Sequence, residues 1–409
     1  MPPVADAKSL RDTSLALAVT LGIQIFVALA ATATAVLAPV IGPDLHVAPR
    51  LVGVFVGLVY AGSMLASLSG GHFIERFGPI RLSQMGVLIC TTGVLVVAIS
   101  TPAWIGLLVL AAVVIGLGYG PITPASSHLL ARTTPPSRLA LTFSIKQTGV
   151  PAGAAIAGAA LPAMAGSVGW RATLLAIAVL GLMIAAAAQS TRGRLDGRAA
   201  ATARPFSFAV LFAPLRTLLQ HRALIELSIA GFVYASMQMC LMSFLVVYLT
   251  ESLAFALVTS GFALTAANLG GIVGRIGWGA VADRWIAPRR MLGILGLAAA
   301  GCSYLVASFS PAWPGAVLLG VCVVFGATAI GWNGVQLSEV ARHAPEGQAG
   351  AITGASGFVT FAGVVLGPPL FALLASLSGS YRVGFAVFGT ASLICGSTLL
   401  LRRVPAPRA

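Results

Sequence analysis

The feature that most constrains the fold is a series of long apolar stretches along the whole sequence. A helix needs about 20 apolar residues to cross the ~30 Å hydrocarbon core of a bilayer. Because lipid offers no partner to backbone N–H and C=O groups, such stretches cross as helices. Charged residues make up only 8% of the chain, and hydrophobic residues 58%. The sequence therefore predicts an all-α membrane protein with twelve transmembrane helices, over residues 14–40, 50–73, 82–100, 103–131, 139–164, 170–189, 223–250, 256–281, 291–310, 313–341, 347–376 and 382–401.

Lysine and arginine are distributed unevenly between the two sides of these helices. Nineteen lie on the side that holds both termini and residues 190–222, three lie on the other side, and two lie inside predicted helices. Cytoplasmic loops carry such an excess of positive charge. We therefore expect a multi-pass protein of the cell inner membrane with both termini cytoplasmic. The same bias accounts for the net charge of +14, so we expect no nucleic-acid partner.

Two polar segments repeat about half a chain apart. Residues 71–81 read GHFIERFGPIR, and residues 279–290 read GAVADRWIAPRR. A second pair, GWR at 169–171 and SYR at 380–382, has a similar offset. We therefore expect two six-helix halves, 1–189 and 223–409, joined by a cytoplasmic linker at 190–222. Parallel repeats of this kind place a binding site at their interface.

The two segments resemble the signature loop of the major facilitator superfamily, Gly-x-x-x-Asp-Arg-x-Gly-x-Arg/Lys. The first copy has Glu75 where aspartate is usual, and the second has Ile286 in place of the later glycine. The resemblance covers the whole chain and implies a transporter in which two halves rock around a central site. It also implies that the charged residues of both loops act in gating, namely Glu75, Arg76, Arg81, Asp283 and Arg284.

Two cations, Lys146 and Arg275, lie inside apolar stretches, whereas none of the ten acidic residues lies near the middle of one. A charge inside a membrane span is costly and points to function. The pattern therefore predicts a small anionic ligand. Two structural alternatives remain open: Lys146 could extend to the cytoplasmic surface, and Arg275 could cap helix-end carbonyls or pair with Glu339.

The resemblance adds two expectations about these cations. Superfamily architecture places helices five and eight beside each other, which would let both cations face one cavity. Arg275 also resembles the substrate-binding arginine of the oxalate–formate exchanger and monocarboxylate transporter branches. Other candidate ligand contacts are polar or aromatic residues at middle depth: Gln24, Tyr60, Tyr119, Tyr234, Gln238, Asn268, Trp332 and Asn333.

These observations predict a secondary transporter for a small organic anion, a carboxylate, working by proton symport or anion exchange. Two alternatives remain: a proton-coupled drug exporter, which acidic residues lining the cavity would favour, and a non-transporting membrane sensor, which loss of the signature loops would favour. We expect no enzyme, because the sequence has no phosphate-binding loop and no nucleophile–base pair. We also expect no catalytic residue, metal or cofactor, and a monomer whose partners are the anion, protons as candidate coupling ion, and the bilayer.

Overall fold

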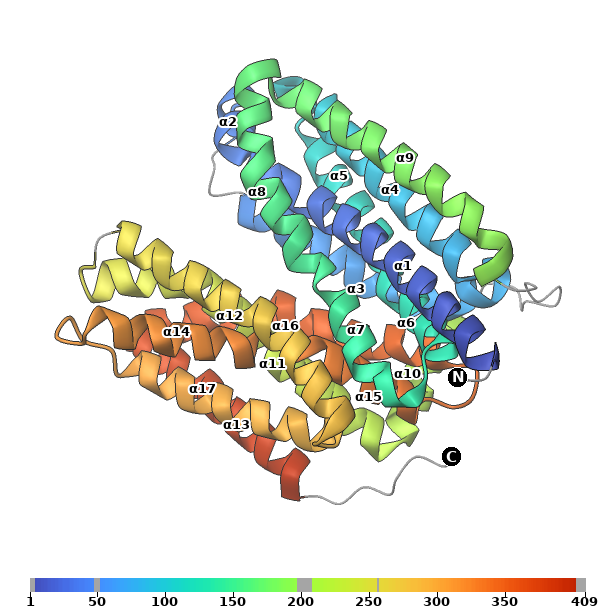
Figure 1. Ribbon diagram of the computed structural model, residues 1–409. Helices are drawn as coiled ribbons and strands as arrows, with labels where there is room; N and C mark the ends of the chain where they lie inside the picture. The colour runs from blue at the N-terminus through green and yellow to red at the C-terminus, as the bar shows by residue number, and fades with distance from the viewer. Residues whose placement is uncertain (1–3, 48–51, 197–207, 256, 402–409) are drawn as a thin grey trace. The chain divides into compact units, whose positions relative to one another are not determined.

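The computed structural model describes residues 4–47, 52–196, 208–255 and 257–401. Within these ranges every regular element is a helix (Figure 1). Six arginines used in the charge count lie outside the described residues, as does the middle of the predicted 190–222 linker. They are Arg50, Arg198, Arg204, Arg402, Arg403 and Arg408. The described part of that linker is helical, because α9 extends to Leu195 and a further helix follows at Phe208–Gln220.

The chain forms two compact units. Unit 1 comprises Met1–Thr134, Lys146–Gln220 and Ala344–Phe358, and unit 2 comprises Pro135–Ile145, His221–His343 and Val359–Ala409. The halves predicted from the sequence, 1–189 and 223–409, do not exchange segments in this way. In the structure, Pro135–Ile145 of the first half belongs to unit 2, and Ala344–Phe358 of the second half belongs to unit 1. Consequently α7 (Leu139–Gln147) begins in unit 2 and ends in unit 1, and α16 (Ala349–Ser378) begins in unit 1 and ends in unit 2.

In unit 1 the helices pair along their lengths: α1 packs against α8, α4 against both α5 and α9, and α3 against α5 (Figure 1). Apart from its parts of α7 and α16, the elements of unit 1 are α1 (Val4–Val36), α2 (Ala38–Asp44), α3 (Val52–Phe77), α4 (Pro79–Ala98), η2 (Pro102–Trp104), α5 (Gly106–Tyr119), α6 (Ile122–Thr133), α8 (Gly149–Val168), α9 (Trp170–Leu195) and α10 (Phe208–Gln220).

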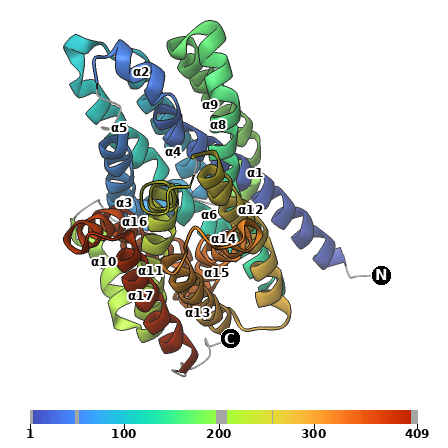
Figure 2. The same ribbon diagram turned by 90° about the vertical axis from the view of Figure 1, so that its left-hand side faces the viewer.

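In unit 2, α13 and α17 lie side by side with α11 next to α17, and α12 packs against α14 (Figure 2). Apart from its parts of α7 and α16, the elements of unit 2 are η3 (Pro136–Arg138), α11 (Arg222–Val247), η4 (Tyr248–Ser252), α12 (Leu257–Arg284), α13 (Pro288–Ala307), α14 (Gly315–Ala329), α15 (Asn333–His343) and α17 (Tyr381–Leu401).

Glycine lets corresponding helices approach closely in both units. In unit 1, a Cβ on Gly116 of α5 would overlap the carbonyl of Val59 on α3. In unit 2, a Cβ on Gly326 of α14 would overlap the carbonyl of Ala267 on α12. Small residues at helix interfaces allow such close backbone packing in membranes. The duplicated contact supports the repeat that the sequence predicts.

Eleven helical stretches among the described residues are long and apolar enough to span a membrane. The helix α12, with 28 residues, is not one of the eleven; it carries Asn268, Arg275 and Asp283 among many small residues. Four predicted spans are each divided between two helices. They are 14–40 (α1 and α2), 103–131 (α5, ending at Tyr119, and α6), 139–164 (α7 and α8) and 313–341 (α14, ending at Ala329, and α15).

Candidate functional site

Lys146 is buried in unit 1 beside α1. It lies in the last turn of α7 and its side chain is 1% exposed. Its Nζ donates a hydrogen bond to Oε1 of Gln24, at 2.6 Å. Gln24 is itself fully buried on α1, and its Nε2 has no hydrogen-bond partner among the described residues. A buried donor of this kind is costly unless a partner satisfies it, which keeps Gln24 a candidate ligand contact.

The close packing of α8 against α1 holds this pair in place. A Cβ on Gly149 would lie 2.9 Å from the Cβ of Gln24, and a Cβ on Gly153 would overlap the carbonyl of Ile25. Glycine at both positions therefore permits the contact. Pro151 follows in the first turn of α8, where a missing N–H costs no helical hydrogen bond.

Arg275 is buried in unit 2, where α12 meets the end of α14. Its side chain is 2% exposed, and its Nε donates to the carbonyl of Ile330, at 3.2 Å. Ile330 follows the last residue of α14, whose final carbonyls have no partner within the helix. Trp278, one turn further along α12, donates from Nε1 to the carbonyl of Ala327, at 2.7 Å. This bond of Arg275 fits the structural alternative of carbonyl capping; the bond that the structure shows for Glu339 is with His343.

Asn333 and Gln238 join Arg275 around the same carbonyl. Nδ2 of Asn333 donates to Ile330 O at 3.3 Å and to Oε1 of Gln238 at 3.2 Å. The carbonyl of Ile330 therefore accepts from both Arg275 and Asn333. The structure thus brings together three of the predicted contacts, on α11, α12 and α15.

The other predicted contacts are held by packing or by local bonds. Tyr234 donates to the carbonyl of Leu292 and packs edge-on against Trp332, with ring centroids 5.8 Å apart. Trp332 donates to Ala329 O at 3.0 Å, and Asn268 donates to Leu264 O of its own helix. In unit 1, Tyr60 and Tyr119 pack edge-on, with centroids 6.4 Å apart.

In the first signature loop, the charged side chains point away from the protein core. Glu75, Arg76 and Arg81 are exposed, and Arg76 lies over the ring of Phe77 at 5.4 Å. Among the described residues Glu75 has no hydrogen bond or ion pair. Its predicted gating role stays a prediction.

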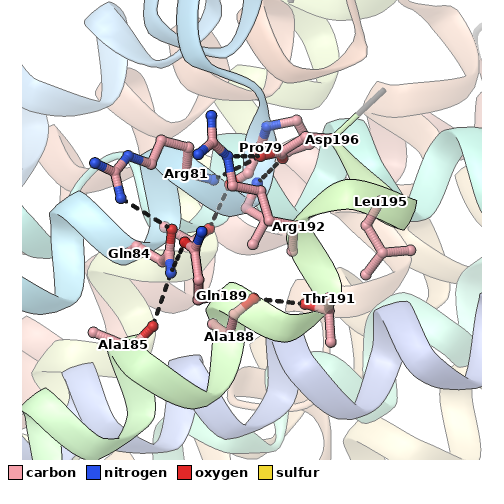
Figure 3. A network of polar contacts seen from close by, with 12 residues as sticks. Pro79, Arg81, Gln84, Ala185, Ala188, Gln189, Thr191, Arg192, Leu195 and Asp196 are labelled. Carbon is pink, nitrogen blue, oxygen red and sulfur yellow. Dashed lines mark hydrogen bonds and ion pairs between the residues drawn. The ribbon is translucent and has the colours of Figure 1, made fainter. Parts of the chain in front are cut away.

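The acid that holds this loop is Asp196, beyond the end of α9 (Figure 3). Its Oδ1 accepts from the backbone N–H of Ile80 at 2.6 Å, and its Oδ2 accepts from that of Arg81 at 3.2 Å. These are unpaired donors of the first turn of α4, so Asp196 caps that helix. Gly78, with φ of 86°, makes room, because a Cβ there would lie 2.6 Å from Cγ of Asp196.

Side-chain amides extend this contact along α4 and α9 (Figure 3). Nε2 of Gln84 donates to the carbonyl of Ala185 at 2.8 Å and to Oε1 of Gln189 at 3.0 Å. Arg192 pairs with Asp196 at 3.3 Å. Burial raises the pKa of Asp196 above its ordinary value, against the opposing effect of the two backbone hydrogen bonds and Arg192.

In the second signature loop, the aspartate of the loop itself caps a helix. Asp283 accepts from the backbone N–H of Ala140 at 3.0 Å and of Leu141 at 2.7 Å, which caps the start of α7. Arg342 of α15 donates to Asp283 at 3.3 Å. Arg284 is exposed. Asp283 therefore fixes the first turn of the helix that carries Lys146 in its last turn.

The sequence reasoning missed Asp196 and the acids that pair near other helix ends. These pairs are Asp12 with Arg194, Asp44 with Arg171, Glu226 with Arg222 and Arg289, Glu251 with Tyr381, and Glu339 with His343. The Arg171 guanidinium lowers the pKa of Asp44, which lies outside the spans. For two of these ion pairs, Arg192–Asp196 and Arg222–Glu226, the four-residue spacing along a helix could have predicted the contact from the sequence. No group of three His, Cys, Asp or Glu among the described residues could hold a metal.

Comparison with known proteins identifies the family and the fold of this chain. Residues 20–368 match the sequence profile of the Major Facilitator Superfamily. The E. coli fucose:proton symporter FucP is similar in structure, with a TM-score of 0.77 and 15% identity, covering 96% of this chain and 100% of that chain. The proton:xylose symporter XylE, bound to 6-bromo-6-deoxy-D-glucose, gives a TM-score of 0.70 and 14% identity, covering 96% and 95%.

At such identities the two structures establish the fold alone, and no curated protein matches the chain. The family match covers most of the sequence and agrees with the helical architecture and the duplicated loops. It confirms the predicted superfamily and a multi-pass membrane transporter rather than an enzyme. The chain belongs to the major facilitator superfamily and is a secondary transporter.

Proposed function

We propose that this transporter carries a small organic anion with a carboxylate group. The observation that carries the proposal is one buried cation in each unit: Lys146 is 1% exposed and Arg275 is 2% exposed. The acidic residues of the sequence, in contrast, lie near the ends of the apolar stretches. Each cation would attract a carboxylate through charge-assisted hydrogen bonds.

The groups around both cations are suited to an acceptor-rich ligand. In unit 1 the ammonium of Lys146 lies beside the amide of Gln24, whose Nε2 donor has no partner among the described residues. In unit 2 the guanidinium of Arg275 lies beside the amide of Asn333. A guanidinium can bind a carboxylate through two parallel hydrogen bonds, which an ammonium cannot do.

The polar residues of α1 argue against the drug-exporter alternative. Among the residues of α1 whose side chains are described, the buried polar ones are Thr20, Gln24 and Thr34, none of which is acidic. A cationic drug would therefore meet a cation at Lys146 with no carboxylate beside it on this helix, because Asp12 lies about three turns away and pairs with Arg194. Retention of both signature loops, with Asp283 bound to the start of α7, argues against a non-transporting sensor.

A binding screen tests the substrate class directly. The purified protein would be heated with a panel of small carboxylates, sulfonates, neutral sugars and organic cations. A ligand that binds only the folded state raises the melting temperature. We expect small carboxylates to raise it and sugars and cations to leave it unchanged; a shift caused by sugars or cations alone would contradict the proposal.

For orientation, we propose that both termini and the described part of the linker face the cytoplasm, with proton symport or anion exchange as the coupling mode. Arg216 on α10 is exposed. In a background without the native cysteines, Arg216→Cys should react with a membrane-impermeant thiol reagent in inverted vesicles and not in intact cells. Labelling in intact cells would reverse the orientation.

A further inference from the structure

Unit 2 has an apolar groove on its outer surface between α11 and α17. Its volume is about 420 Å³, within the ~300–1,000 Å³ typical of small-molecule sites. Two exposed side chains flank it, Ile229 at 50% and Ile394 at 62% exposed. Its lining also includes the small residue Ala391 and the buried Leu399. In a membrane protein, exposed apolar side chains of this kind face lipid tails.

One end of the groove is charged. Glu226 lines the groove and is bound by two arginines, Arg222 at 3.1 Å and Arg289. Glu226 and Arg289 are largely buried, with side chains 8% and 12% exposed, whereas that of Arg222 is 69% exposed. Arg222 therefore presents positive charge at the mouth of the groove.

We propose that this groove binds one anionic phospholipid of the surrounding bilayer, with an acyl chain between α11 and α17 and its phosphate at Arg222. The groove matches an amphiphile because its lining is mostly apolar along its length and the exposed Arg222 lies beside Glu226 at one end. Arg222 begins α11 and the groove runs along the last turns of α17, so both mark the same side of the membrane. That side carries the basic excess, and basic pockets between helices there bind anionic headgroups.

The lipid site is independent of the transported anion. It uses neither Lys146 nor Arg275, and all of its residues belong to unit 2. Arg289 pairs with Glu226, as a buried carboxylate requires. Loss of anion transport in an Arg275 variant should therefore leave lipid binding unchanged, which separates this proposal from the proposed function.

Native mass spectrometry of the delipidated full-length protein tests the site, with phosphatidylglycerol and phosphatidylcholine as the two probes. We expect wild type to retain one phosphatidylglycerol in preference to phosphatidylcholine. Arg222→Gln should weaken phosphatidylglycerol binding about fivefold, the effect of one basic group near an anionic headgroup. Ala391→Trp, which fills the groove, should weaken both lipids by more than that.

Matched controls keep the result specific. Arg290 is exposed at the start of α13, and Leu393 is exposed on α17; neither lines the groove. Arg290→Gln and Leu393→Trp should therefore bind lipid as wild type does. Equal retention of the two lipids by wild type, or unchanged phosphatidylglycerol binding in Arg222→Gln, would overturn the proposal. Because Arg222 is mostly exposed, its variant remains informative even if Ala391→Trp fails to fold.

Discussion

The two buried cations differ in what holds them. Lys146 donates to the side-chain amide of Gln24, on another helix of unit 1. Arg275 donates to the backbone carbonyl of Ile330, which is fixed at the break between α14 and α15 of unit 2. The partner of Lys146 is therefore a side chain, whereas the partner of Arg275 is part of the backbone at a helix end.

Burial alone therefore does not identify which charged residue binds a ligand. Under the proposed function Arg275 would have two roles, because its Nε donates to the end of α14 and its guanidinium would bind the anion. The bond from Lys146 ends on a side chain and does not hold the end of a helix. Substitutions should therefore separate the two: changes at Arg275 should affect both stability and transport, and changes at Lys146 should affect mainly transport.

The largest effect is expected for Arg275→Ala. It removes a charged donor from the proposed ligand and a hydrogen bond from Ile330 O. Each charge-assisted hydrogen bond contributes ~1.5–3 kcal/mol, so loss of two to a carboxylate should lower anion affinity at least a hundredfold. The melting temperature should fall as well. Trp278→Phe, which deletes the neighbouring bond to Ala327 O and keeps the charge, should lower stability and preserve affinity.

Lys146→Gln should come next. It removes the charge and keeps a polar side chain beside Gln24, so anion affinity should fall about 10–100-fold through loss of one charge-assisted hydrogen bond. The melting temperature should change less than in Arg275→Ala. Titration of both variants with the best carboxylate, alongside their thermal melts, compares the two cations. A larger loss of stability at Lys146 than at Arg275 would break the distinction between them.

A smaller effect on binding is expected for the carboxylates that cap α7 and α4. Asparagine is as good a helix cap as aspartate, so Asp283→Asn removes the charge and retains the cap. If the second loop acts in gating, this variant should transport more slowly with little loss of affinity. Asp196→Asn makes the same change outside the signature loops and should transport at the wild-type rate. Equal rates in Asp283→Asn and wild type would contradict a gating role.

The smallest effect concerns pH and Asp196. Burial raises the pKa of Asp196 above 3.8, so the folded protein holds this proton more tightly than the unfolded chain. Stability from this group is therefore present below 3.8 and is lost as pH rises through the higher folded-state pKa. The melting temperature of wild type, relative to that of Asp196→Asn, should fall over this window. A constant difference would show that burial does not dominate at Asp196.

The sequence predicted the helices and the superfamily because both depend on local patterns. Apolar length identified the spans, and the duplicated loops at 71–81 and 279–290 identified the repeat. The break between α5 and α6 coincides with Gly120-Pro121, a local signal that long apolar runs obscured.

The contacts that hold the candidate site depend on distant parts of the chain. Asp196 binds Ile80 across 116 residues, and Asp283 binds Ala140 across 143. No periodicity in the sequence indicates such pairs. The partner of Arg275 is a backbone carbonyl, Ile330 O, which any residue type could supply. The sequence could therefore identify Lys146 and Arg275 as unusual charges and could not identify what binds them.

The most direct test of the central claim is uptake of labelled small carboxylates into proteoliposomes that contain wild type, Arg275→Lys or Arg275→Ala, with Arg290→Ala as control. Arg275→Lys keeps the charge but loses the planar guanidinium, which can donate two parallel hydrogen bonds to a carboxylate. We therefore expect at least a tenfold loss of affinity, which corresponds to ~1.4 kcal/mol. Arg275→Ala should do worse, Arg290→Ala should match wild type, and unlabelled carboxylates should compete where sugars and cations do not. Transport at the wild-type level by both Arg275 variants, or competition by cations alone, would contradict the account.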